Sequence, residues 1–228
     1  MKLGLLGKGK TGSFLIGVCN DKKIELVVFD SKNPPTAASL KDLDGVISFL
    51  PGEAFVSYLP LLLASKLPVV SGSTGFEWPE GVREKIADEK LSWLQANNFA
   101  LGMAVVRLMI ENMGLISKLV PEASFDLHEI HHTKKLDAPS GTALSFKKWS
   151  GVEMPITSER TGDVIGIHTM TATTSGEKIT LTHEALDRKI FAEGAVWAME
   201  RMLESRPSGL IDLHQLLSSH LLGKGLSL

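Results

Sequence analysis

The densest group of chemically active side chains lies between Glu129 and Ala143, a segment that reads EIHHTKKLDAPSGTA. It holds two histidines and two lysines within five residues, followed by a Ser-Gly-Thr sequence typical of a helix N-terminus. Such a cluster of positive charge and hydrogen-bond donors suits an anionic substrate. Because a histidine gains and loses a proton near neutral pH, His131 is a candidate acid or base.

Two other interpretations of this segment compete with a substrate site on the residues alone. The first is a zinc site, but the single cysteine gives no cysteine pair, and the segment has no His-x-x-x-His spacing. Lysine is also not a usual zinc ligand, so we predict no metal. The second is an exposed polar loop without a chemical role. The residue types do not decide between that loop and a substrate site.

A second group of residues indicates nucleotide binding. Residues 7–12 read GKGKTG, a G-x-G-x-x-G between a strand pattern and a helix pattern. Glycines there permit a tight turn and a close approach of the backbone to a pyrophosphate, whose charge the helix N–H groups bind. Asp30 ends the next strand pattern, where an acidic residue accepts hydrogen bonds from ribose hydroxyls. We predict a dinucleotide site; the alternative is a structural turn, with Asp30 a solvated strand end.

The elements that position these two groups predict two domains. In the first half, strand and helix patterns alternate, as in a doubly wound α/β domain with a parallel sheet. Its strands are expected at Lys2–Leu6, Ile24–Phe29, Gly45–Phe49, Pro68–Val70 and Leu91–Leu94, with helices at Thr11–Asn20, Glu53–Ser65 and Arg83–Glu89. In the second half, strand patterns follow one another instead of alternating with helix patterns, which predicts an α+β domain with a mixed sheet. Its elements are a helix at Met103–Val120, a strand at Phe125–Ile130, a helix at Thr142–Trp149 capped by Ser140, antiparallel strands at Ile165–Ala172 and Lys178–His183, a helix near Ala192–Glu204, and a closing segment around Leu213–Leu222.

Composition excludes several classes of protein. With 43% hydrophobic and 22% charged residues, the chain is typical of a soluble globular protein. A net charge of −2 argues against a nucleic-acid binder. The most apolar stretch, Tyr58–Ala64, is too short for a membrane span and contains Pro60. Cys19 stands alone, which excludes an internal disulfide and suits a reducing compartment. Together with the lack of a signal-peptide pattern, this predicts a cytoplasmic protein.

The segment at 129–143 also matches the signature E-x-H-H-x-x-K-x-D-A-P-S-G-T-A of the 4-hydroxy-tetrahydrodipicolinate reductase (dihydrodipicolinate reductase) family. Further segments similar to that family lie in order along the chain. They are GKGKTG, GSTGF after the fourth strand, ANNFALG, GDVIGIHT and ITLTHEA. The chain therefore resembles this family over nearly its whole length.

The resemblance implies a role for individual residues. His131 takes the position of the catalytic acid or base, and Lys135 that of a lysine that both assists proton transfer and holds the substrate. The substrate-binding positions are His132, Lys135, Ser140, Gly141 and Thr142. The cofactor-binding positions are Gly7, Lys8, Gly9, Lys10, Thr11, Gly12, Asp30, Gly72, Ser73, Thr74, Ala96, Asn97, Asn98 and Phe99. The implied cofactor is NADH or NADPH, with NADH preferred.

The resemblance also implies an architecture and a reaction. It places a Rossmann domain at residues 1–101 and 205–228 and a substrate-binding and oligomerisation domain at 102–204. The small cyclic dicarboxylate 4-hydroxy-tetrahydrodipicolinate would be reduced to tetrahydrodipicolinate in lysine and diaminopimelate biosynthesis, by a homotetramer or a dimer. Two other functions stay open: a different two-domain dehydrogenase, which leaves HHTKKLDAPSGTA unexplained, and a non-catalytic dinucleotide sensor, which needs no acid at His131.

Overall fold

A computed structural model of the chain describes residues 1–223 and forms two compact units. The first unit comprises Met1–Ala100 together with the chain from Lys189 onward, and the second comprises Leu101–Arg188. The first unit is therefore discontinuous in sequence. The predicted first domain extends to residue 228, and residues 224–228 of it lie outside the described residues.

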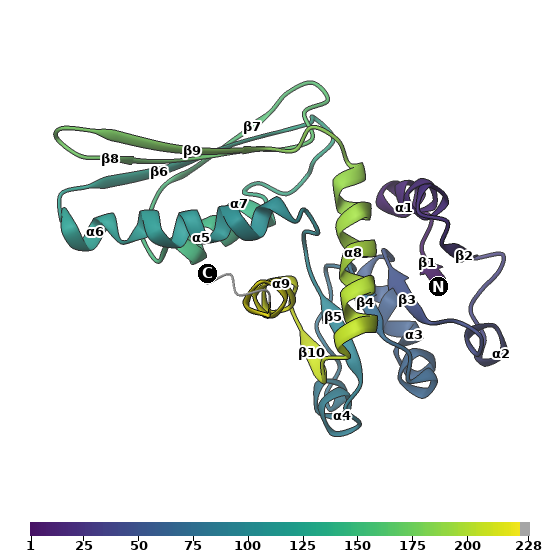
Figure 1. Cartoon of the computed structure of the whole chain (residues 1–228). Helices are drawn as coiled ribbons and strands as arrows, with labels where there is room; N and C mark the ends of the chain where they lie inside the picture. Colours follow the sequence, from purple (N-terminus) through teal and green to yellow (C-terminus); the bar gives the residue numbers. More distant parts are fainter. Residues whose placement is uncertain (224–228) are drawn as a thin grey trace. The chain divides into compact units, whose positions relative to one another are not determined.

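The first unit contains a parallel sheet of six strands in the order β10-β5-β4-β3-β1-β2 (Figure 1). Its strands are β1 (Lys2–Leu6), β2 (Glu25–Phe29), β3 (Gly45–Ser48), β4 (Val69–Ser71), β5 (Ser92–Gln95) and β10 (Gly209–Ile211). Its helices are α1 (Lys10–Asp21), α2 (Ala37–Leu40), α3 (Gly52–Ser65), α4 (Val82–Asp88), α8 (Lys189–Ser205) and α9 (Leu213–Leu222). The central strands are buried and rich in leucine, valine and isoleucine, as sheets covered on both faces require. This confirms the predicted doubly wound Rossmann-like domain.

Helix α8 differs from the prediction in the unit to which it belongs. The predicted boundary left residues 189–204 in the second domain, but α8 packs against α1 and against β3 and β4 of the first unit. Its buried face carries small side chains, and a Cβ added at Gly194 would lie 1.7 Å from the carbonyl oxygen of Phe99. This close approach fixes the helix on the first unit.

The second unit is a four-stranded mixed sheet with helices against one face. Its strand order is β7-β6-β8-β9, formed by β6 (Ser124–His131), β7 (Ile156–Arg160), β8 (Ile167–Thr173) and β9 (Lys178–Glu184). Strand β6 pairs with β7 in parallel and with β8 antiparallel, and β8 pairs antiparallel with β9. The helices are α5 (Gly102–Gly114), α6 (Ile116–Leu119) and α7 (Gly141–Ser150). The predicted α+β domain with a mixed sheet is confirmed.

Strand β6 shows how the sequence positions the candidate site. Its side chains alternate between exposed and buried, and the buried set is Phe125, Leu127, Glu129 and His131. Because successive side chains of a strand point to opposite faces, Glu129 and His131 continue the apolar stripe toward the covered face. Two polar, ionisable groups are thus placed in the interior of the second unit.

Three short elements have no counterpart in the sequence-based expectation: α2, β7 and β10. Strand β7 reads ITSER and β10 has three residues, so neither carries an apolar pattern long enough to predict a strand. The single helix expected at Met103–Val120 is divided into α5 and α6. Among the helices that the structure describes, none combines the length and apolar character that a membrane span requires.

Candidate active site

The site is organised around the buried carboxylate of Glu129. Its Oε1 atom accepts hydrogen bonds from the backbone N–H of Ser140 (3.0 Å), the hydroxyl of Ser158 (2.7 Å) and Nη2 of Arg160 (3.0 Å). The strand register explains these partners, because Ser158 lies opposite Glu129 on β7, and Arg160 lies opposite His131. One carboxylate oxygen is therefore held by three donors, one from the N-cap of α7 and two from β7.

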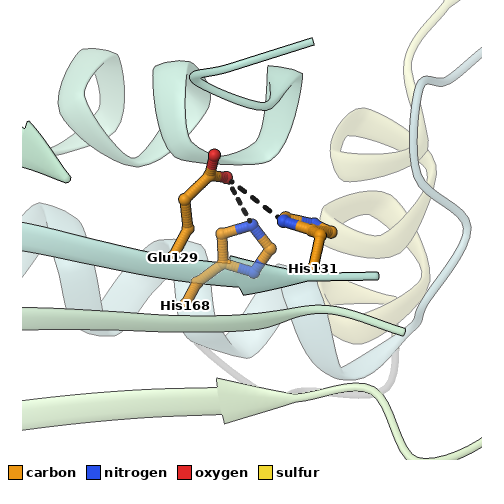
Figure 2. Close-up of side chains that lie close together, drawn as sticks. All are labelled: Glu129, His131 and His168. Atoms are coloured by element: carbon orange, nitrogen blue, oxygen red, sulfur yellow. Dashed lines mark ion pairs between the residues drawn. The ribbon is translucent and has the colours of Figure 1, made fainter. Parts of the chain in front are cut away.

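Two imidazoles face the other oxygen of Glu129. The Oε2 atom lies 3.5 Å from Nδ1 of His131 and 3.6 Å from Nε2 of His168, and Figure 2 shows both rings turned toward this oxygen. His168 arrives there because it is the antiparallel partner of Glu129 on β8. The two rings meet edge to face, with centroids 5.0 Å apart. Glu129, His131 and His168 thus form one compact buried cluster.

The charges of this cluster follow from its surroundings. Burial raises the pKa of Glu129, but the hydrogen bonds from Ser140, Ser158 and Arg160 outweigh it and hold that pKa at about 2. Burial lowers the pKa of His168 to about 4, and His131 acts in the same direction. Burial also lowers the pKa of His131, against the opposing charge of Glu129. At neutral pH the cluster is an ionised carboxylate beside two neutral imidazoles.

The low pKa of His168 predicts a pH-dependent stability. Between pH 6.5 and 4 the unfolded chain binds a proton on His168 that the folded chain does not bind, so the free energy of unfolding should fall as the pH falls through this window. The contribution should reach at most about 3 kcal/mol. Urea denaturation at several pH values should show a shallower loss for His168→Gln than for the wild type. Identical slopes would show that another group causes the loss.

The loop after β6 places the predicted lysine beside the cluster. Lys135 Nζ forms an ion pair with Asp137 at 2.7 Å, and the backbone N–H of Lys135 donates to the carbonyl of His132. Arg160 ties this loop to β7, since its guanidinium donates to the carbonyls of Lys135 and Asp137. Arg160 therefore connects the loop that carries Lys135 to the Glu129 carboxylate.

Ser140 begins helix α7 as the sequence predicted. Its hydroxyl accepts from the N–H of Ala143 at 3.1 Å and lies 3.1 Å from Nε2 of His168. Because its N–H also donates to Glu129, both polar groups of Ser140 already have partners inside the chain. Gly141 is exposed and Thr142 half-buried in the first helical turn, where backbone N–H groups lack an intrahelical acceptor. These two residues are the better placed to meet an anion.

The glycine turn of the first unit fits a dinucleotide at each of its three glycines. Gly7 has φ of +92°, and a Cβ there would lie 3.0 Å from the backbone of Leu50. A Cβ on Gly12 would lie 2.0 Å from the carbonyl oxygen of Gly7, so this glycine permits close packing of α1 on the turn. Around Gly9 nothing lies within 4 Å of a Cβ, which leaves room for a pyrophosphate. Lys8, Lys10 and the half-buried Thr11 complete the turn.

Asp30 lies exposed at the end of β2, on the same side of the sheet as the glycine turn. Its Oδ1 accepts hydrogen bonds from the backbone N–H groups of Lys32 (2.8 Å) and Asn33 (3.0 Å), which lower the pKa of the carboxyl. The side chain is therefore a charged acceptor at the strand end next to β1. In folds of this kind ligands bind outside the carboxyl ends of the strands, where the strand order reverses.

The other predicted cofactor residues follow β4 and β5 at this same edge. Gln95 Nε2 donates to the carbonyl of Ser73 at 2.6 Å, and the ring of Phe99 packs edge to face on Phe49 beside Gly72. Ser73 and Phe99 are buried, Gly72, Ala96 and Asn98 are partly buried, and Thr74 and Asn97 are exposed. Within this set Ser73 and Phe99 support the turns, whereas Thr74 and Asn97 can meet a ligand.

Comparison with known proteins identifies the family. A 4-hydroxy-tetrahydrodipicolinate reductase of Bdellovibrio bacteriovorus is 31% identical over 227 residues, which covers 95% of this chain and 96% of that protein. One of Xanthomonas axonopodis pv. citri is 36% identical over 169 residues, covering 73% and 69%. The chain belongs to the 4-hydroxy-tetrahydrodipicolinate reductase family. It is an oxidoreductase of that family.

A family model also matches this chain, and two solved structures are similar to it in fold. The family model described as "Dihydrodipicolinate reductase, C-terminus" matches residues 105–217 of the reductase chain. A solved dihydrodipicolinate reductase from Paenisporosarcina sp. TG-14, with dipicolinate bound, is similar in fold with a TM-score of 0.75 at 24% identity, covering 94% of this chain and 98% of that one. The diaminopimelate dehydrogenase of C. glutamicum has a TM-score of 0.54 at 12% identity and covers 99% of both chains.

Sequence reasoning missed two members of this reductase's cluster, Glu129 and His168, and two residues that donate hydrogen bonds to Glu129, Ser158 and Arg160. For Glu129 a signal existed, because the alternation along Phe125–Ile130 places it on the face of His131. His168 lies in a strand that was expected, but its register with β6 was not. Ser158 and Arg160 lie on β7, whose sequence gives no strand pattern.

The same cluster bears on the expectation of no metal. Ligand atoms of Glu129, His131 and His168 all lie within 4.8 Å of one another, a set that transition metals can use. The guanidinium of Arg160 already forms an ion pair with the Glu129 carboxylate. Lys135 adds a further positive charge, which lowers the pKa of His131. This positive charge opposes a bound cation, so a role in proton transfer fits the cluster better.

Proposed function

We propose that the chain reduces 4-hydroxy-tetrahydrodipicolinate to tetrahydrodipicolinate with a reduced nicotinamide cofactor, in lysine and diaminopimelate biosynthesis. The observation that carries this proposal is the position of His131 within the family signature, paired with the buried carboxylate of Glu129. A generic dehydrogenase or a dinucleotide sensor does not require such a pair. The glycine turn, open at Gly9, supports the cofactor assignment.

The proposed chemistry assigns each residue a task. The substrate loses water, made of its hydroxyl and a hydrogen of the ring, and the unsaturated ring that results gains a hydride and a proton. The cofactor, when bound, supplies the hydride. As negative charge builds on the ring, His131 delivers the proton with help from Lys135, a contribution of about 10²–10⁴-fold in rate. The N–H groups of Gly141 and Thr142, with His132, bind the substrate carboxylates.

A coupled assay tests the function. The condensation product of pyruvate and aspartate semialdehyde is generated in the cuvette, and the absorbance of NADH is followed after the protein is added. The proposal expects NADH oxidation that depends on this product. NAD⁺ reduction with an amino acid or a sugar, without NADH oxidation by this product, would favour a different dehydrogenase. Cofactor binding without turnover would favour a sensor.

Cofactor choice depends on Asp30. Its exposed carboxylate accepts from ribose hydroxyls and repels a 2′-phosphate, whereas Lys32 two residues later can attract that phosphate. We therefore predict use of both cofactors, with NADH preferred. Asp30→Ala should raise the share of NADPH in the ratio of kcat/KM values, and Lys32→Ala should lower it. A wild-type protein that used NADPH far better than NADH would contradict this role of Asp30.

A flat ring with two carboxylates should occupy the substrate site. We predict that pyridine-2,6-dicarboxylate inhibits competitively against the substrate and raises the melting temperature, because ligands that bind only the folded state stabilise it. Thr142→Val should weaken its binding by roughly 1–3 kcal/mol, the usual cost of losing a partner to a charged group. Pyridine-2,4-dicarboxylate is the control, since its second carboxylate is misplaced. Equal inhibition and equal shifts in melting temperature with the two isomers would contradict the assignment of a dicarboxylate site.

We further propose a cytoplasmic homo-oligomer, a tetramer or a dimer. Light scattering coupled to size-exclusion chromatography distinguishes the two states.

A further inference from the structure

The two oxygens of Glu129 have different surroundings. Three donors hold Oε1, from α7 and from two positions on β7. No hydrogen-bond partner is assigned to Oε2 within the described residues, although Glu129 is fully buried. An ionised, buried oxygen is costly unless a donor or a positive charge comes close to it. The groups that face it are the imidazoles of His131 and His168.

The two ring nitrogens of His131 also have different surroundings. Nδ1 lies 3.5 Å from Oε2 of Glu129, so a small closure brings it to hydrogen-bond distance. Nε2 lies beside Gly166, where an added Cβ would be only 3.1 Å away. The glycine therefore leaves space at Nε2. A proton held on Nδ1 by the carboxylate makes Nε2 the nitrogen that exchanges protons with a ligand.

We propose that Glu129 is a positioning residue for proton transfer, which fixes the Nδ1–H form of His131 and stabilises its imidazolium while Nε2 delivers the proton. This inference rests on the proposed function, because it requires His131 to be the acid. The step is balanced: the neutral Nδ1–H imidazole first takes up a proton from water on Nε2, the N–H bond at Nε2 then breaks as a bond from that proton to the substrate ring forms, and the imidazole returns to its neutral Nδ1–H form. Carboxylate–histidine pairs control the tautomer of catalytic histidines in the same way.

Arg160 extends the role of Glu129 to the neighbouring loop. Its Nη2 bonds to Oε1 of Glu129, and the same guanidinium holds the carbonyls of Lys135 and Asp137. The carboxylate thus aligns His131 directly and the loop of Lys135 through Arg160. The charged and titratable groups around His131 are then Glu129 from β6, Lys135 and Asp137 from the loop, Arg160 from β7, and His168 from β8.

The test uses Glu129→Gln, which keeps the shape of the side chain and removes its charge. We expect kcat at pH 7.5 to fall roughly 10- to 100-fold, with the KM for the substrate changed less than about threefold, because the variant impairs an acid rather than a binding group. Since Glu129 raises the pKa of His131, the alkaline limb of the kcat/KM profile should move to lower pH. Glu129→Asp keeps the charge. The alkaline limb of its kcat/KM profile should therefore stay at the wild-type pH, even if kcat falls.

A second measurement does not depend on the folding of any variant. Nitrogen-15 spectra of the wild-type imidazoles should show neutral His131 protonated on Nδ1, and an Nε2–H form would overturn the proposal.

Thr157→Val is the matched control for the pH profile of Glu129→Gln. It removes a hydrogen bond between β6 and β7 on the opposite face, where Thr157 Oγ1 lies 2.8 Å from Nδ1 of His128. Its pH profile should be that of the wild type.

The outcomes separate this inference from the proposed function. Suppose that His131→Ala is inactive but that the alkaline limb of kcat/KM in Glu129→Gln lies at the same pH as in the wild type. Glu129 then does not position the acid, and the proposed function stands. If the wild type does not turn over the substrate, the function itself fails. Metal analysis gives a further outcome: about one zinc ion per wild-type chain, absent from Glu129→Gln, would make the carboxylate a ligand and overturn the positioning role.

Discussion

His131→Ala is expected to lower kcat by on the order of 10²-fold or more while leaving the affinity for NADH nearly unchanged. The imidazole ends β6 in the second unit, with Nδ1 beside Glu129 and Nε2 beside Gly166. The glycine turn that fits the cofactor belongs to the first unit. Loss of the imidazole therefore removes the acid and leaves the nucleotide site intact. Steady-state kinetics with saturating substrate, and calorimetric titration with NADH, measure the two effects separately.

A histidine on the same strand is the control for this variant. His128 lies on the opposite face of β6, where it contacts Thr157 and Glu159. His128→Ala should keep a kcat within about twofold of the wild type, because surface substitutions away from a site usually have small effects. A near-normal kcat in His131→Ala would end the assignment of His131 as the acid. A loss of NADH affinity in that variant would show that the two units are coupled through this residue.

The elements of both units could be predicted from the sequence where hydrophobic periodicity was strong. The strands β1 and β3 and the helix α3 are apolar enough that burial decides their structure. The expected end of the second domain, residue 204, differs from the end of the second unit at Arg188, because α8 is amphipathic and an amphipathic pattern does not say which unit its apolar face covers. Its assignment depends on close contacts such as that of Gly194 with Phe99, which are properties of the folded chain.

The candidate site also has one part that the sequence could indicate and another part that it could not. His131 and the glycine turn could be proposed from chemistry-bearing residues that are adjacent in the sequence, whereas the role of Lys135 was implied by the resemblance to the family signature. The partners of Glu129 were missed because they come from strand pairing: Ser158 and Arg160 lie about 30 residues away, and His168 lies nearly 40 away, on neighbouring strands. Strand register is set by the tertiary fold, and β7 carries no alternating pattern that would have revealed it.

Gly9→Val is expected to weaken NADH binding roughly tenfold to a hundredfold, which corresponds to about 1.4–2.8 kcal/mol, with little change in melting temperature. Gly9 is the N-cap of α1 with φ of −75° and ψ of −161°, a conformation that valine adopts without strain. No atom lies within 4 Å of an added Cβ. An added Cβ therefore meets no other atom of the protein, and the valine side chain fills the space through which a pyrophosphate approaches the backbone.

Two other glycines of α1 make this prediction specific to the cofactor. A Cβ on Gly12 would lie 2.0 Å from the carbonyl oxygen of Gly7, so Gly12→Ala should lose stability and NADH binding together. Gly17 is exposed within α1 and has open space around its Cβ position, so Gly17→Ala should bind NADH normally and gain up to about 1 kcal/mol of stability. Fluorescence titration with NADH and thermal melts on the three variants measure both quantities. If Gly9→Val bound NADH as tightly as Gly17→Ala does, the space at Gly9 would not be the pyrophosphate site, and the cofactor would have to approach the sheet elsewhere.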